Sequence, residues 1–201
     1  MHRVPIATVQ SCGRAVDELA AALAAGIVLA IPTESSYGLA ADPMSERGVD
    51  RVLAVKGREP GKPLLVLCAG RSQLDRLGIA AGAGLLDRFF AIWPAPLTVV
   101  LPLTRPIPAS CGAPSLAVRV PAHEGLRAVL AGIGPVTGTS LNRSGQPPCA
   151  DPDEIVRLFE GEVDVLVDGG RTPGGAPSTL LDATVDPPRV LREGAFPWPP
   201  A

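Results

Sequence analysis

Short apolar runs separated by glycine- and proline-rich breaks restrict the fold of this chain more than any other feature. Runs with the length of a strand occur at residues 27–31, 64–67, 97–103 and 116–120. None reaches the roughly 18 residues that a membrane-spanning helix needs. The run at 27–31 is apolar throughout, which predicts a strand covered on both faces. Apolar residues at helical spacing lie between the runs, at 13–25, 46–56, 85–93 and 124–130.

The remaining segments and their order predict the fold class. Asp-Pro at 151–152 is a favourable helix start, so a helix is expected over 151–159. Short strands are expected at 163–167, 179–181 and 189–191. Strands and helices alternate irregularly, which favours an α/β fold of the α+β layered type over a regular doubly wound sheet. A chain of 201 residues fits a single domain spanning 1–201.

The charge and cysteine pattern excludes several classes of site. The formal net charge is −2, so any anion site must be a local group of basic residues. The four cysteines lie far apart without a CxxC pair, and with only two histidines a zinc site is not expected. The N-terminal residues lack the pattern of a signal peptide. These observations predict a cytoplasmic protein with unpaired thiols and no membrane contact.

Rare polar residue types are concentrated in three loops. The two lysines, Lys56 and Lys62, lie in KGREPGK with Arg58 between them, while the one tyrosine lies in PTESSYGL and the one asparagine in TSLNRSG. Lysine and arginine together suit a phosphate group, because one is a movable point charge and the other a planar fork. The same charges are also compatible with a solvated helix C-terminus. Neither a Walker A loop nor a GxGxxG fingerprint is present.

Hydroxyl groups and two arginines accompany these loops. PTESSYGL follows a buried strand, where its hydroxyls are placed either to bind a small zwitterion or to form a structural turn. TGTSLNRSGQP has the glycines and hydroxyls of an anion-binding nest. Arg119 stands in the apolar run 116–120, so it must either find a partner or line a cavity, and the cavity is favoured. Arg192 repeats that pattern at the end of a strand.

Seven motifs in order carry a family resemblance. They are PTESSYGL (32–39), KGREPGKPL (56–64), WPAPLT (93–98), AVRVP (117–121), TSLNRSG (139–145), APSTLLD (176–182) and LREG (191–194). Each motif alone is a weak signal, but their order and spacing over residues 26–194 resemble the YrdC/Sua5 family, the threonylcarbamoyl-AMP synthases. The resemblance implies a twisted mixed sheet flanked by helices, with an open concave basic site. The length resembles the short, single-domain form of the family.

The resemblance also implies a reaction and its partners. L-threonine, bicarbonate and ATP would become threonylcarbamoyl-AMP and pyrophosphate, with Mg²⁺ held through the ATP phosphates rather than by a protein metal site. The product would pass to a tRNA threonylcarbamoyl-transferase complex that modifies adenosine 37 to N6-threonylcarbamoyladenosine. Weak binding of tRNA by the chain itself stays open.

Site residues are carried over motif by motif. Lys56 and Arg58 resemble the catalytic positions. The residues that resemble the ATP side are Arg58, Lys62, Ser115, Ser140, Asn142 and Arg192. The residues that resemble the threonine side are Thr33, Ser35, Tyr37, Arg119 and Ser178.

The chain departs from the family pattern at several of these positions. Ser35 replaces a threonine and keeps its hydroxyl, and KGRE replaces KGRP, with Pro60 one place later. Leu141 replaces an alanine and is expected to bring a larger side chain close to the nucleotide. Leu67 and Pro148 stand where relatives often have histidine and serine.

Two other functions remain as alternatives. One is an RNA-binding module for tRNA or double-stranded RNA, which the acidic balance and the scarcity of lysine disfavour. The other is a related carbamoyl-adenylate-forming enzyme, such as the similar domain of hydrogenase-maturation proteins. Those proteins are usually longer and carry zinc-finger-like cysteines, which this sequence lacks.

Overall fold

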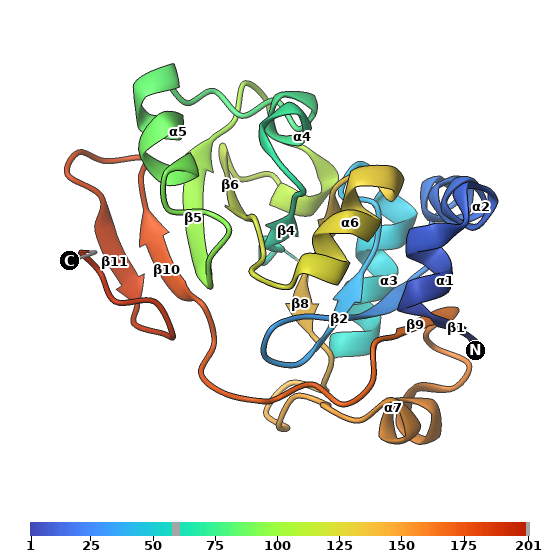
Figure 1. The fold of residues 1–201 in the computed structure, drawn as a ribbon. Helices are drawn as coiled ribbons and strands as arrows, with labels where there is room; N and C mark the ends of the chain where they lie inside the picture. The colour runs from blue at the N-terminus through green and yellow to red at the C-terminus, as the bar shows by residue number, and fades with distance from the viewer. Residues whose placement is uncertain (58–60, 200–201) are drawn as a thin grey trace.

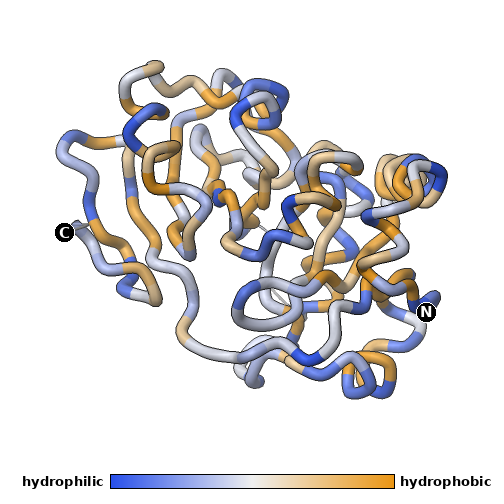
Figure 2. The backbone as a smooth tube through the Cα atoms, viewed as in Figure 1, coloured by the Kyte–Doolittle hydropathy of each residue, from blue (hydrophilic) through white to orange (hydrophobic). Residues whose placement is uncertain are grey.

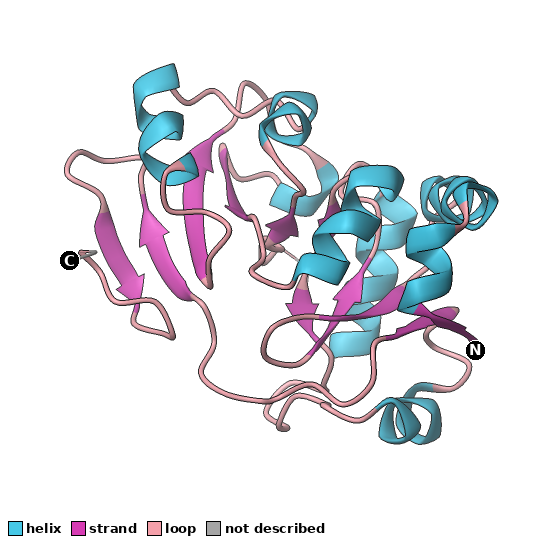
Figure 3. Ribbon diagram, viewed as in Figure 1, coloured by secondary structure: helices cyan, strands magenta, loops and turns pink. Residues whose placement is uncertain are grey.

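The strands divide between two mixed sheets in the computed structural model, which describes residues 1–57 and 61–199 (Figures 1 and 3). The five-stranded sheet has the order β1-β9-β2-β3-β8. Its strands are β1 (His2–Pro5), β9 (Val165–Asp168), β2 (Leu29–Pro32), β3 (Tyr37–Ala40) and β8 (Thr139–Ser140). β1, β9 and β2 run parallel, whereas β3 and β8 pair antiparallel.

The six-stranded sheet has the order β11-β10-β5-β6-β4-β7 and combines parallel and antiparallel pairs. Its strands are β11 (Arg189–Arg192), β10 (Thr179–Asp182), β5 (Leu97–Pro102), β6 (Ser115–Arg119), β4 (Val66–Leu67) and β7 (Val136–Thr137). The α/β class is therefore confirmed, with the strands in two sheets rather than in one continuous sheet.

Two short stretches of chain carry the backbone from one sheet to the other. At Gly138, between β7 and β8, the chain leaves the six-stranded sheet, and a Cβ atom there would lie only 2.5 Å from Cγ of Leu67. The second stretch is the crossing segment, residues 169–178, which joins β9 to β10 along the lower edge of the view in Figure 1. The two sheets are therefore joined by these two links.

Helices pack against both faces of β2 in the five-stranded sheet. α1 (Ile6–Ser11), α2 (Gly13–Ala24) and α6 (Glu124–Ile133) contact one another and share a core cluster with Leu29 and Ile31 of β2. Ala30, between those two residues, belongs to the cluster on the opposite face, which includes residues of α3 (Glu46–Lys56). β2 is thus buried on both faces, as its apolar run predicted. The remaining helices are α4 (Arg71–Arg76), α5 (Ala83–Phe90), α7 (Pro152–Phe159) and the short 3₁₀ helix η1 (Pro108–Ser110).

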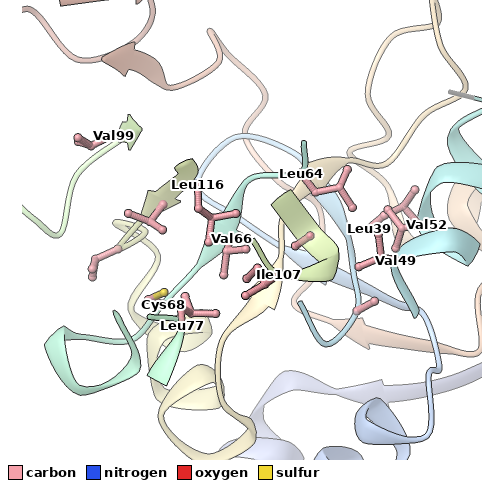
Figure 4. Close-up of a cluster of buried hydrophobic side chains, with 14 of the residues drawn as sticks. Leu39, Val49, Val52, Leu64, Val66, Cys68, Leu77, Val99, Ile107 and Leu116 are labelled. Carbon is pink, nitrogen blue, oxygen red and sulfur yellow. The ribbon is translucent and has the colours of Figure 1, made fainter. Parts of the chain in front are cut away.

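The second core cluster extends from one sheet to the other. In Figure 4, Val49 and Val52 of α3 lie beside Leu39 of β3, and Leu64 and Ile107 continue the apolar contact to β4 and β6. Apolar stretches follow the strands and helices in Figure 2, while the crossing segment is pale. None of the described helices has the length and apolar character required to cross a membrane. Cys12 is exposed, Cys68 and Cys149 are buried, and Cys111 is half-buried.

Candidate active site

A cavity of about 600 Å³ lies between the two sheets. Its walls come from the loop after β2, from β3 and β8, and from β5, β6, β10 and the crossing segment (Figure 1). The polar side chains among its lining are those of Thr33, Ser35, Ser36, Tyr37, Thr98, Arg119, Thr139, Ser140, Ser178 and Arg192. Residues from all seven sequence motifs therefore line one cavity, although they are far apart in the chain.

The loop after β2 is fixed by the hydroxyl of Thr33. This hydroxyl donates to the carbonyl of Ser36 at 2.7 Å and accepts from the amides of Ser35 and Ser36 at 3.3 Å. Among the described residues, the hydroxyl of Ser35 has only a long 3.4 Å contact with the hydroxyl of Thr33. Thr33 therefore shapes the turn, while the Ser35 hydroxyl keeps hydrogen-bonding capacity for a ligand.

Tyr37 begins β3 and its side chain is fully buried. Its hydroxyl donates to the carbonyl of Gly170 at 2.8 Å and accepts from the amide of Gly169 at 3.1 Å. Burial raises the pKa of this phenol to about 12. The structure thus gives Tyr37 a visible role in anchoring the crossing segment, next to the cavity that it helps to line.

Arg119 ends β6 and points to the cavity, although only 5% of the residue is exposed. Its Nη1 atom lies 3.2 Å from Oε1 of Glu34. Burial lowers the pKa of the guanidinium, Glu34 raises it, and nearby Arg192 lowers it further. The residue predicted to need either a partner or a cavity has both.

Ser178, Thr98 and Arg192 form a second polar group on the six-stranded sheet. The hydroxyls of Thr98 and Ser178 are 2.8 Å apart and buried, and the Arg192 guanidinium donates to the Ser178 carbonyl at 2.8 Å. The backbone of LREG packs closely on APST, because Ala195 donates to the Pro177 carbonyl at 2.8 Å. These contacts hold the Ser178 hydroxyl and the Arg192 guanidinium at the same edge of the cavity.

Lys56, Ser140 and Asn142 form a buried network behind this wall. The Lys56 ammonium donates to the Ser140 carbonyl at 2.8 Å, to its hydroxyl at 3.2 Å, and to Oδ1 of Asn142 at 2.7 Å. The amide of Asn142 donates to the carbonyls of Gln146 and Arg143. Ser140 lines the cavity, whereas Lys56 and Asn142 are not among the described lining residues. The two side chains therefore position Ser140 and its loop.

The other predicted residues are placed less directly. Ser115 shares the cavity-facing side of β6 with Ala117 and Arg119, but it stands at the far end of the strand and is not among the described lining residues. Lys62 is exposed, one residue before Pro63 in the cavity wall. Arg58 and the KGRE departure lie outside the described residues.

The other departures from the family pattern have different surroundings. Leu141 is fully buried and belongs to the core cluster, so its larger side chain turns away from the cavity, contrary to the expectation that it would approach the nucleotide. Leu67 is also buried in the core, while Pro148 lines the cavity. Sequence reasoning assigned no role to Glu34 or Thr98. Glu34 is the acidic residue of PTESSYGL, and Thr98 is the last residue of WPAPLT. Their places in these motifs were the only sequence signal that could have identified them.

Comparison with protein families shows to which family this chain is related. The model of the Sua5/YciO/YrdC domain, described as "Telomere recombination", matches residues 21–194. The chain belongs to this family. It is 36% identical over 192 residues to a threonylcarbamoyl-AMP synthase from Pyrococcus abyssi, covering 90% of this chain and 56% of the relative. The chain thus spans about half the length of that curated relative.

Solved structures of the Sua5/YciO/YrdC family share the fold. Sua5 from P. abyssi in complex with L-threonine superposes with a TM-score of 0.81 at 31% identity, covering 98% of this chain and 57% of that one. YciO from E. coli gives a TM-score of 0.76 at 26% identity, covering 91% and 90%. The likeness to YciO extends over nearly the whole of both chains.

Proposed function

We propose that this chain forms L-threonylcarbamoyl-AMP and pyrophosphate from L-threonine, bicarbonate and ATP. The observation that carries the proposal is the convergence of Arg119, Ser35, Ser178, Arg192 and Ser140 on one cavity between the sheets. Guanidinium and hydroxyl groups suit an amino-acid carboxylate at one end and phosphates at the other. The relative named as a threonylcarbamoyl-AMP synthase and the Sua5 structure with L-threonine support this choice of substrate.

In this proposal the threonine end is built around Arg119. Its guanidinium binds the substrate carboxylate, and the hydroxyls of Ser35 and Ser178 contact the rest of the amino acid. Thr33 and Tyr37 keep the loop and the crossing segment in place through the hydrogen bonds described above.

The ATP end is built around Ser140 and Arg192, with Lys62 and Arg58 as further cationic groups and Ser115 as a more remote contact. Lys56 and Asn142 act by holding Ser140, so their contribution is one of position. The described residues contain no group of three side chains fit to hold a metal ion. Mg²⁺ would arrive on the ATP phosphates and neutralise part of their charge.

The chemistry requires position and positive charge more than a protein nucleophile. The threonine amine combines with bicarbonate to give a carbamate and water. A carbamate oxygen then bonds to the α-phosphorus of ATP as the bond to the β-phosphate oxygen breaks, and pyrophosphate leaves. Placing the two reactants in line and stabilising the charge that develops on the phosphates accounts for most catalysis of this type.

We also propose a cellular setting that follows from this reaction. The product would serve a downstream transferase complex that modifies adenosine 37 of tRNA, in the cytoplasm. Residues 1–201 would act as one domain, since the family match runs over 21–194.

The deciding experiment measures pyrophosphate release with L-threonine, bicarbonate and ATP. We expect release that depends on both threonine and bicarbonate, and weaker release with L-serine or L-valine. Release without threonine would favour a related carbamoyl-adenylate activity. No release, with salt-sensitive tRNA binding that threonine leaves unchanged, would favour an RNA-binding module.

A further inference from the structure

Glu34 and Arg119 form a buried ion pair that joins the two sheets. Glu34 comes from the loop after β2 in the five-stranded sheet, and Arg119 from β6 in the six-stranded sheet. Their side chains are 18% and 6% exposed, with 3.2 Å between Oε1 and Nη1. A buried guanidinium without a counter-charge is strongly unfavourable, so Glu34 accounts for the stability of this cation in the absence of a ligand.

The pair is loosely made. Both carboxylate oxygens of Glu34 and Nε of Arg119 are buried without a hydrogen-bond partner among residues 1–57 and 61–199, whereas a well-formed pair has charge-assisted bonds of about 2.7–2.9 Å. Arg119 lines the cavity, and Glu34 is not among the described lining residues. Arg119 therefore keeps donors for a ligand, and Glu34 acts on that ligand only through Arg119 and through its charge.

The charges of Arg119, Arg192 and Glu34 add up to one positive charge beside the cavity. Arg192, assigned above to the ATP end, lines the same cavity as Arg119 and its charge acts on Arg119, while Glu34 compensates the Arg119 charge. One positive charge remains for a ligand. Removal of the Glu34 charge would leave two, and in a partly desolvated site that difference acts far more strongly on a doubly charged anion than on a singly charged one.

We propose that Glu34 is a specificity-determining residue that matches this end of the cavity to a single carboxylate and discriminates against dianions. The naming of L-threonine as the ligand rests on the proposed function, since threonine would present one carboxylate to Arg119. The charge balance itself does not depend on which monocarboxylate binds.

The test compares two small anions by nuclear magnetic resonance titration: L-lactate with one carboxylate and malonate with two. The measured quantity is the ratio of malonate affinity to lactate affinity. In Glu34→Gln we expect this ratio to rise at least about tenfold, equivalent to about 1.4 kcal/mol. A displaced Arg119 would weaken both anions together and leave the ratio unchanged, which would overturn the proposal.

Further variants keep the test decisive if Glu34→Gln folds poorly. Arg192→Gln lowers the net charge of this group to zero and should reduce the malonate-to-lactate affinity ratio. The double variant Glu34→Gln with Arg192→Gln restores one positive charge. Its affinity ratio should lie within about threefold of wild type. Glu34→Asp, which keeps the charge, should also stay near wild type. Glu18→Gln makes the same change in the exposed Arg14–Glu18 pair and serves as the matched control.

The outcomes separate this proposal from the proposed function. A ratio that follows the charge balance, in a protein that releases no pyrophosphate with threonine, would support the role of Glu34 and reject the reaction. Threonine-dependent pyrophosphate release, with a malonate-to-lactate affinity ratio that does not change in Glu34→Gln, would support the reaction and reject the role of Glu34. Failure of both anions to bind any of these proteins would overturn the role of Glu34.

Discussion

The Nζ atom of Lys56 lies 2.7 Å from Oδ1 of Asn142, and both side chains are buried. Lys56 ends α3, and Gly57 follows in the left-handed conformation with φ of 59°. The helix therefore delivers the ammonium to the end of β8, where the Ser140 carbonyl and hydroxyl also accept from it. Lys56, which was expected to act on phosphate, thus has a structural role, because its ammonium donates to a carbonyl, a hydroxyl and an amide oxygen of the described chain.

Replacement of Asn142 by alanine should destabilise the chain and reduce activity together. The variant removes an acceptor from a buried ammonium, a loss of about 1–3 kcal/mol in the free energy of unfolding. It also frees the loop whose Gln146 carbonyl accepts from the Asn142 amide at 2.6 Å. Chemical denaturation and pyrophosphate release measure the two effects. Gln146→Ala, an exposed change in the same loop, is the control and should leave both near wild type.

Replacement of Arg119 by lysine should affect threonine more than ATP. Lysine keeps the charge that Glu34 requires but loses the planar fork that suits a carboxylate. We expect the KM for L-threonine to rise at least about tenfold, the scale of one charge-assisted contact, with the KM for ATP within about twofold. Steady-state kinetics at varied threonine and ATP provides the measurement. An equal rise in both constants would contradict the assignment, and the exposed Arg105→Lys is the control.

Gly194 should tolerate no side chain. A Cβ atom at this position would lie 2.3 Å from the Pro177 carbonyl oxygen, which is backbone and cannot move aside cheaply. Gly194→Ala should therefore lower the free energy of unfolding by about 1–3 kcal/mol, as overpacking does, and disturb Ser178 beside it. Gly84→Ala is the matched control, because a Cβ there meets nothing within 4 Å and the position is inside α5. Thermal unfolding should show no loss for the control.

Asp164 should make part of the stability depend on pH. Burial would raise the pKa of its carboxyl, but the hydrogen bonds from Arg51 and the Val28 amide outweigh this and hold it below the ordinary value. The contribution is therefore present at neutral pH and is lost as pH falls from the ordinary value near 4 through the lower folded-state value. In acid titrations followed by circular dichroism, Asp164→Asn should be less stable than wild type at neutral pH. The two curves should converge as pH falls below the lowered pKa of the Asp164 carboxyl. Parallel curves would contradict this account.

Regular elements with local signals were predictable from the sequence. The helix expected over 46–56 is observed as α3, because Ser45 caps its start through the Gly48 amide and Gly57 ends it. The helix expected over 151–159 begins where Asp151 accepts from the Asp153 amide. α1, α4 and β3 carried no such signal. β3 is four residues long and buried, and it pairs with the neighbouring β2 on one side and with the distant β8 on the other.

The candidate site was predictable as a set of residues and not as an arrangement. The motifs indicated which side chains belong together, and Arg119 in an apolar strand required a cavity or a partner. Sequence spacing contains no information on which carboxylate would reach that guanidinium, since Glu34 is brought to it by packing of the two sheets. It likewise could not show that Leu141 faces the core or that Lys56 supports Ser140 from behind.

Because Tyr37 is hydrogen-bonded to Gly169 and Gly170, its ultraviolet absorption can report on the crossing segment that joins the two sheets. Tyr37 is the one tyrosine of the chain, so its phenolate absorption contains no contribution from another residue of that kind. Burial raises its pKa to about 12, and the hydrogen bonds to the crossing segment depend on the same burial. If the segment detaches, the ring meets water and ionises nearer the ordinary value of about 10. An ultraviolet titration of the unlabelled protein therefore reports whether the crossing segment stays hydrogen-bonded to Tyr37 beside the cavity.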